Sequence, residues 1–275
     1  MNLVKADLHN HLKTGGFFPK KIDTNKIIDQ ARARLGKNGV LGVVNYEPSR
    51  RYEDLAQEGT YQREDLGNSL WFSDKKILVV RGEEIETNLP NGQMIEVLAL
   101  GLDGSEGNIS HGRSLEYTLQ AVKERGGIVG ADHPFHHGGI GNYLLDNPEL
   151  LRKLDFIETH NGEAAIWLPG VTQIGVNRRA WNLFRWAVHT YPHLELGSLV
   201  SSDGHSKFEI GSSYTTIPEI DRRDAPTITE SLRRGLIIAG KKHLPVRRSD
   251  SYFGAMKHIA EWVAVKKLHW KPGVL

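Results

Sequence analysis

The chain has 275 residues, no cysteine, and a formal net charge of +2 from 35 basic and 33 acidic residues. This length suits one large domain that buries a sizeable core. Without cysteine there are no disulfides or thiolate sites, so any metal site must use nitrogen and oxygen ligands. The small net charge gives no general attraction to nucleic acid or to membranes. The absence of a leader-like start and of any apolar run approaching about 18 residues predicts a cytoplasmic protein.

Apolar runs with strand character alternate along the chain with helical patterns. This order of strand, helix and strand predicts a mainly parallel sheet in one domain over residues 1–275, with a basic helical tail from about residue 241. A polar excursion at residues 48–68 interrupts the pattern. The expected elements are, in chain order, strand 4–8, helix 24–35, strand 40–44, strand 76–80, strand 95–100, helix 115–125, strand 128–131, strand 156–157, helix 176–187, strand 199–200, helix 226–234 and helix 252–265.

Acidic and imidazole residues recur where these strands stop. His9 and His11 are two apart, so both leave the same face of an extended strand. One such pair is as often two ordinary histidines as a metal site, but Asp203 and His205 repeat the spacing far downstream. In barrels of parallel strands, catalytic groups converge at the carboxyl ends of the strands. We therefore expect one site with several metal ligands, drawn from His9, His11, Glu84, His133, His160, Asp203 and His205.

These segments resemble, in order, the motifs of the PHP (polymerase and histidinol phosphatase) superfamily. The matching segments are Asp7-Leu8-His9-Asn10-His11, Gly82-Glu83-Glu84-Ile85, Asp132-His133-Pro134-Phe135, Ile157-Glu158-Thr159-His160-Asn161 and Ser202-Asp203-Gly204-His205. The resemblance spans roughly residues 1–220 and implies a distorted (β/α)7 TIM-like barrel with two or three divalent ions at one mouth. It also implies metal-ligand roles for the residues His9, His11, Glu84, His133, Asp203 and His205, with Glu84 as a bridging carboxylate. His160 lies in a motif that usually reads Glu-x-x-Asn.

The sequence departs from the family pattern at three places, and two of these departures remove ligands for at least one ion. The usual loop aspartate is replaced by Gly15 or Gly16, and the usual Asp-His pair after the second strand is replaced by Asn45-Tyr46. A histidine common on the fourth strand is replaced by Glu96, whose carboxylate can serve as a substitute ligand for a hard ion. We therefore expect one or two divalent ions per chain, Mn, Zn or Fe, and not three.

The function that best fits these residues is a divalent-metal-dependent phosphoesterase acting on a small phosphorylated metabolite or nucleotide. Metal-activated water would attack phosphorus, with Asp203, His205 or His160 accepting its proton. Arg81, His136 and Arg178 are the candidates for binding substrate, although each arginine is about twice as often an ordinary solvated charge. We do not expect nucleic acid or a membrane as partner, and an oligomer is compatible with the sequence.

Two further functions fit the same residues. Similar ligand sets catalyse amidohydrolase-like hydrolysis of a C–N or C–O bond. The missing Asp-His pair also leaves open a degenerate, non-catalytic PHP module that binds a ligand or a partner. Metal content separates the module from the enzymes, and a substrate panel separates the two enzymes.

Overall fold

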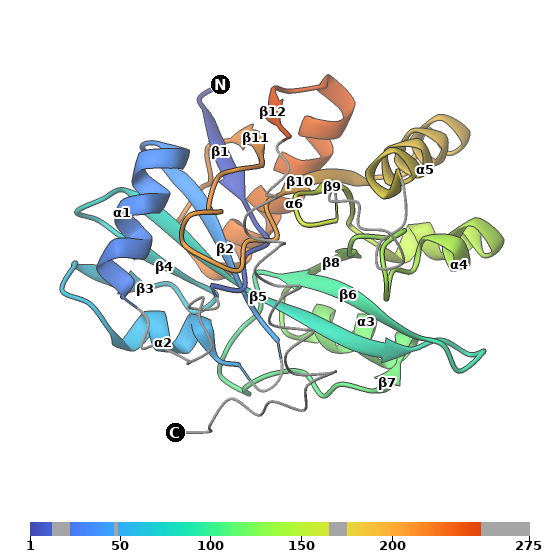
Figure 1. The fold of residues 1–275 in the computed structure, drawn as a ribbon, viewed down its shortest axis with the longest axis horizontal. Helices are drawn as coiled ribbons and strands as arrows, with labels where there is room; N and C mark the ends of the chain where they lie inside the picture. Colours follow the sequence, from blue (N-terminus) through green and yellow to red (C-terminus); the bar gives the residue numbers. More distant parts are fainter. Residues whose placement is uncertain (13–22, 47–48, 165–174, 249–275) are drawn as a thin grey trace, which may run out of the picture.

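The computed structural model describes residues 1–12, 23–46, 49–164 and 175–248 (Figure 1). Their strands form one sheet in the order β10-β9-β8-β6-β5-β2-β1-β11-β12, with β3, β4 and β7 paired at its side. The strands are β1 Leu3–Asp7, β2 Gly39–Asn45, β3 Arg63–Asp65, β4 Ser69–Phe72, β5 Ile77–Asn88, β6 Met94–Leu100, β7 Arg113–Ser114, β8 Ile128–Ala131, β9 Phe156–Asn161, β10 Gly197–Ser201, β11 Tyr214–Pro218 and β12 Val246–Arg247. The helices are α1 Thr24–Leu35, α2 Arg51–Gln57, α3 Leu115–Glu124, α4 Gly141–Asp146, the 3-10 helix η1 Pro148–Lys153, α5 Val176–Thr190 and α6 Ala225–Lys242.

The sheet curls into a nearly closed, distorted barrel. β1, β2 and β5 are parallel to one another, as are β8, β9 and β10. The ring is completed where β10 returns beside β1, because Asn10 and Gly204 form an isolated bridge. The Asp7 carboxylate fastens this seam by accepting hydrogen bonds from Ser202 N at 3.0 Å and Gly211 N at 2.7 Å. The predicted barrel of mainly parallel strands is confirmed.

One strand of the ring, β6, runs antiparallel to both of its neighbours, β5 and β8. β5 and β6 form a hairpin whose turn is closed by Leu89 N donating to Gln93 O at 2.8 Å. Gly92 sits in this turn with a φ of 80°, which suits glycine. As a result β6 begins at the rim where the parallel strands end, which brings Glu96 to the same rim as Glu84.

Alternation along the strands separates an inner from an outer face. One apolar cluster takes residues from all seven ring strands and from α6, so it fills the barrel interior; among its members are Val4, Val40, Leu78, Leu98, Ile128, Phe156, Leu199 and Leu232. Two other clusters pack the outer face against helices: one under α1 and α2, the other under α3, α4 and α5. On β5, Leu78 and Val80 therefore face inward, and Ile77 and Val79 face outward.

The helices begin and end for local reasons. Asp23 caps α1 by accepting a hydrogen bond from Lys26 N at 3.1 Å, and Gly36 ends that helix. The polar excursion after β2 includes the short helix α2, which buries Tyr52 and Leu55. No helix among the described residues is long and apolar enough to cross a membrane. The predicted helix 252–265, most of the basic tail and the Gly15-Gly16 departure lie outside the described residues.

Candidate metal centre

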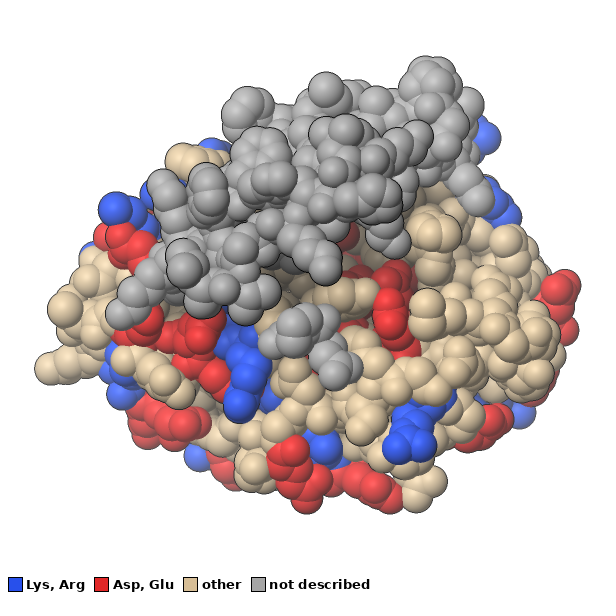
Figure 2. All heavy atoms as spheres, turned by 60° about the horizontal axis from the view of Figure 1, so that its bottom comes forward, with Lys and Arg blue, Asp and Glu red and all other residues tan. Residues whose placement is uncertain are grey.

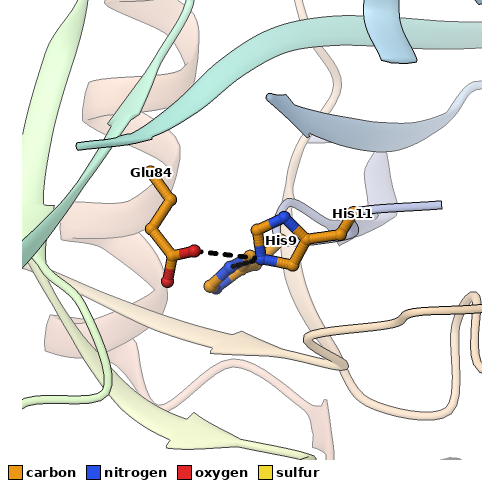
Figure 3. A group of neighbouring side chains, drawn as sticks. All are labelled: His9, His11 and Glu84. Carbon is orange, nitrogen blue, oxygen red and sulfur yellow. Dashed lines mark hydrogen bonds and ion pairs between the residues drawn. The ribbon is translucent and has the colours of Figure 1, made fainter. Parts of the chain in front are cut away.

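Four side chains converge where β1 and β10 end, beside Glu84 within β5. His9 Nε2 and His11 Nε2 lie 3.1 Å apart, and Asp203 Oδ1 lies 3.4 Å from each of them. Glu84 Oε2 approaches His11 Nε2 at 3.3 Å, and Figure 3 shows this carboxylate pointing at the two imidazoles. We call this set of atoms position A. Such separations are those of ligands around one cation, since bonds of about 2.1 Å at right angles put neighbouring ligand atoms about 3 Å apart.

A second set lies on the other side of Glu84. His133 Nε2 is 3.2 Å from Glu84 Oε1 and 3.5 Å from Glu96 Oε2. We call the atoms of Glu84, Glu96 and His133 position B. Gly138 makes room for Glu96, because a Cβ on this residue would lie 2.5 Å from Glu96 Oε2. The two oxygens of Glu84 thus face different sets, which is the geometry of a bridging carboxylate.

His205 extends the centre at its outer side. His11, Asp203 and His205 form a further group of potential ligand atoms, and the His11 and His205 ring centroids are 4.9 Å apart. His205 Nδ1 lies 2.9 Å from Glu163 Oε2 and 3.0 Å from Asp203 O. Both neighbours are acceptors, so Nδ1 carries a proton. Asp203 itself has a φ of 49°, a left-handed conformation that aspartate tolerates.

A layer of buried polar groups holds these side chains in place. Glu158 Oε1 accepts from His9 Nδ1 at 3.1 Å, and its Oε2 accepts from His133 N at 2.8 Å. Asn161 Nδ2 donates to Glu158 Oε2 at 3.0 Å and to Asp203 Oδ2 at 3.1 Å. Carboxylates that fix the outer nitrogen of a histidine are a regular feature of metal sites. Glu158 and Asn161 therefore orient ligands from both halves of the barrel.

The pKa values show how strongly these groups act on one another. Burial disfavours a charged His9, but the carboxylates of Asp203 and Glu158 outweigh burial and raise its pKa to about 10. For His133, burial likewise lowers the pKa, but the carboxylates of Glu84 and Glu96 outweigh it and raise the pKa to about 10. Burial, reinforced by the charge of Glu84, raises the pKa of Glu96 to about 7. In these imidazoles a bound cation would take the place of the proton.

The residues present fit divalent metal. The described residues contain four groups of three ligand residues whose atoms lie within 4.8 Å of one another, and nearly all of these residues are buried. Asp203 Oδ1 is buried and accepts no hydrogen bond, although it lies between two imidazole nitrogens. A buried carboxylate without a donor is costly unless a cation faces it. The donor set is nitrogen and oxygen only, which suits Zn, Mn or Fe.

Other predicted site residues lie elsewhere or make different contacts. His160 is buried in β9 but contributes no atom to the four ligand groups. His136 is half-buried with its ring centroid 5.5 Å from that of His133, and burial together with His133 lowers its pKa to about 4. Arg178 is exposed in the first turn of α5, the helix that follows β9. These three residues remain candidates.

Arg81 is a correction to the sequence analysis. It is fully buried on the outer face of β5, away from Glu84, because the two residues are three positions apart on a strand whose side chains alternate between faces. Its guanidinium forms ion pairs with Glu53 Oε1 at 3.1 Å and Glu83 Oε1 at 2.8 Å, and donates a hydrogen bond to Asn108 Oδ1 at 3.1 Å. These contacts leave Arg81 a structural cation, and not a group that binds substrate.

The sequence analysis did not single out several groups that line the centre. Glu163 belongs to the loop after β9, and nothing in its spacing pointed to His205. Tyr46 donates a hydrogen bond to Glu86 Oε1 at 2.6 Å, and its ring lies 6.4 Å from that of His11. Tyr46 follows β2 at a place where the PHP pattern has a metal ligand, and this position was the sequence signal that could have pointed to it. Figure 2 shows the end of the molecule toward which β1 runs, with Asp and Glu side chains gathered in a hollow.

Comparison with known proteins gives likeness in fold and none in sequence. No family model matches the chain, and no curated protein is significantly similar. The crystal structure of PsfC from Pseudomonas syringae PB-5123 is similar over 98% of this chain and 100% of that one, with a TM-score of 0.58 and 17% identity. The lesion-specific endonuclease PfuEndoQ from Pyrococcus furiosus is similar over 90% of this chain and 57% of that one, with a TM-score of 0.50 and 12% identity.

A two-domain protein from Bacteroides vulgatus that contains a predicted PHP-like metal-dependent phosphoesterase is also similar, at 14% identity and a TM-score of 0.46, over 86% of this chain and 63% of that one. One of our expectations is contradicted by the endonuclease. Endonuclease Q was crystallised with a 27-mer duplex carrying an abasic lesion, so the expectation that excluded nucleic acid as a partner was wrong. The predicted distorted barrel is confirmed at the level of the fold, which this chain shares with PsfC and with PfuEndoQ.

Proposed function

We propose that this protein is a metal-dependent phosphoesterase. The observation that carries the proposal is the position of Glu84, whose two oxygens face position A at 3.3 Å and position B at 3.2 Å. His9, His11 and Asp203 would complete the coordination of one divalent ion, and Glu96 and His133 that of the other. A pair of such ions supplies Lewis acidity and lowers the pKa of water to roughly 7. This chemistry suits the hydrolysis of a phosphoester.

The chain's own residues supply proton transfer and orientation. Glu163 Oε2 lies 2.9 Å from His205 Nδ1 and would keep a proton on that nitrogen, so Nε2 is the atom that we assign to accepting a proton or binding an ion. Asn161 holds the Asp203 carboxylate through Oδ2, so Oδ1 points at the two imidazoles. Asp203 and His205 are therefore the residues we assign to activating water, with His160 as the third candidate. Because these groups are fixed before substrate binds, little reorganisation is needed during reaction.

We infer that two residues, His136 and Arg178, meet the substrate. His136 has a pKa of about 4, so near neutral pH it offers a neutral imidazole that can hydrogen-bond to an ester oxygen without adding charge. Arg178 is exposed in the first turn of α5 and would offer the positive charge that phosphate needs. A small phosphorylated metabolite or nucleotide could accept contacts from both His136 and Arg178. The fold shared with a lesion-specific endonuclease adds the phosphodiester of DNA to the substrates that need testing.

The test is metal reconstitution followed by a substrate panel. Protein stripped with a chelator is reloaded with Mn²⁺, Zn²⁺ or Fe²⁺, and bound metal is counted by elemental analysis. Turnover is then measured on phosphomonoesters, phosphodiesters, a DNA duplex with an abasic site, and amides. We expect up to two ions per chain and metal-dependent release of phosphate or of a cleaved diester. Hydrolysis of amides alone would favour the amidohydrolase, and neither metal nor turnover would favour a binding module.

A further inference from the structure

Asp132 differs from every other carboxylate around the centre. It is 0% exposed, yet neither of its oxygens accepts a hydrogen bond. Oδ1 lies 3.4 Å from His9 Nδ1, and Oδ2 lies 3.4 Å from His133 Nε2. An unpaired carboxylate in this surrounding is strongly disfavoured unless a proton or a cation compensates it.

The backbone directs this side chain into the barrel. Ile128 of β8 belongs to the interior cluster, whereas Val129 and Ala131 belong to an outer cluster. Asp132 directly follows Ala131, and because side chains alternate along a strand, it faces inward like Ile128. Its carboxylate therefore points toward the other ligands. β8 is still paired with both of its neighbours at the preceding residue, because Ala131 lies opposite Val97 of β6 and Ile157 of β9.

Asp132 does not resemble the carboxylates that support ligands from behind. Glu158 accepts hydrogen bonds from Ser201 Oγ, His133 N and Asn161 Nδ2 besides His9, which satisfies both of its oxygens. Asp7 likewise accepts from Ser202 and Gly211. The supporting carboxylates thus have their donors, whereas Asp132 accepts no hydrogen bond and lies close to the carboxyl groups of Glu84 and Glu158.

The position of Asp132 Oδ2 matches that of a ligand in position B. Around His133 Nε2, the three nearest carboxylate oxygens of this set lie at 3.2 Å for Glu84, 3.4 Å for Asp132 and 3.5 Å for Glu96. Separations of about 3.0–3.4 Å are expected between ligands bound at about 2.1 Å with angles between square and tetrahedral. Asp132 Oδ2 thus lies as close to His133 Nε2 as the two glutamate oxygens do, while Asp132 also forms a group of potential ligand atoms with His9 and Glu158.

We propose that Asp132 is a ligand of position B, which makes the two metal positions chemically unequal. This inference rests on the proposed function. Position B would hold an ion with three carboxylates and one imidazole, whereas position A offers two imidazoles and two carboxylates. Carboxylate-rich sites favour hard ions such as Mn²⁺, and imidazole-rich sites favour Zn²⁺. The centre is then built for two different ions, with the harder one in position B.

The experiment measures metal binding to the full chain. Wild type, Asp132→Asn and Asp132→Ala are compared with a control, Asp155→Asn. Asp155 is a partly buried carboxylate outside the ligand groups and accepts a hydrogen bond from Val129 N at 3.0 Å. Metal-free proteins are titrated with Mn²⁺ and with Zn²⁺. Elemental analysis measures the number of ions bound per chain, and electron paramagnetic resonance reports the environment of bound Mn²⁺. Circular dichroism checks the fold of each variant, and the alanine variant serves where the asparagine variant does not fold.

We expect wild type and Asp155→Asn to bind two ions, with Mn²⁺ preferred at one position. Both Asp132 variants should bind Mn²⁺ at least tenfold more weakly at that position, change its resonance spectrum, and keep one Zn²⁺ with unchanged affinity. If the Asp132 variants bind two ions with wild-type affinity and spectrum, the inference is refuted while the proposed function stands. If wild type itself binds no divalent ion, both fail.

Discussion

Two clusters of buried charge lie on opposite faces of the same strand, β5, and they differ in how the charge is compensated. On the outer face, Arg81 is surrounded by Glu53, Glu83 and backbone carbonyls, so the cation has close partners. On the inner face, Glu84 lies among further carboxylates and histidines, and Asp132 and Asp203 keep oxygens without hydrogen bonds. A buried charge with close partners is structural, and a cluster whose carboxylates keep oxygens without donors is suited to bind cations.

The largest effect is expected on the inner face. Glu84→Gln replaces the side chain that faces both positions, so both ions should be lost and turnover should fall by about three orders of magnitude. The matched control is Glu86→Gln, two residues further along β5, whose carboxylate accepts from Tyr46 and belongs to none of the ligand groups. Elemental analysis and steady-state kinetics measure both variants. Equal loss of metal in the two would contradict the assignment.

On the outer face, Arg81→Met should destabilise the fold and leave metal binding intact. Removing the guanidinium leaves Glu83 buried without its counter-charge, which costs about 3–5 kcal/mol of unfolding free energy. Urea denaturation of the metal-free protein measures this loss, and elemental analysis of the folded fraction measures metal. A stable variant with a raised KM would instead restore Arg81 as a substrate-binding residue.

A smaller effect is expected from the group that orients His205. Glu163→Gln keeps the shape of the side chain but weakens the interaction with Nδ1, which lies 2.9 Å away. Loss of such a partner typically costs about 10–100-fold in metal affinity or activity. Titration with Mn²⁺ and the pH profile of kcat give the measurement. An unchanged profile would show that Glu163 does not set the tautomer of His205.

The smallest effect is expected for the exposed cation. Arg178→Ala should raise KM for a phosphomonoester by about tenfold and leave kcat and metal content unchanged, because a surface charge–phosphate contact contributes on the order of 1 kcal/mol. Arg179→Ala is the neighbouring control, since its guanidinium lies 4.2 Å from the Phe135 ring centroid and donates to Asn142. A larger effect of the control would move the substrate-binding role to Arg179.

Strand ends were predictable from sequence, because apolar runs stop visibly before polar residues. His9, His11, Glu84, His133 and Asp203 all follow such runs, and the structure brings their side chains together. Arg81 was misassigned although alternation already separates it from Glu84: an odd spacing of three puts the two on opposite faces. The same rule, applied to β8, would have pointed to Asp132.

Other parts of the centre depend on contacts that sequence spacing does not encode. Glu96 reaches position B because β6 turns back in a hairpin, which a pattern of apolar runs does not distinguish from a crossover. Glu163 and His205 lie in two different loops, 42 positions apart in the sequence, and their side chains meet at the centre. Such pairings follow from how the barrel closes, and hence from packing over the whole chain.

The most direct measurement is anomalous X-ray diffraction from crystals of the full chain grown with Mn²⁺ and with Zn²⁺. The account predicts two anomalous peaks on either side of the Glu84 carboxylate, one beside His9, His11 and Asp203 and the other beside Glu96 and His133. Peaks at other places, or none near Glu84 at saturating metal, would contradict it.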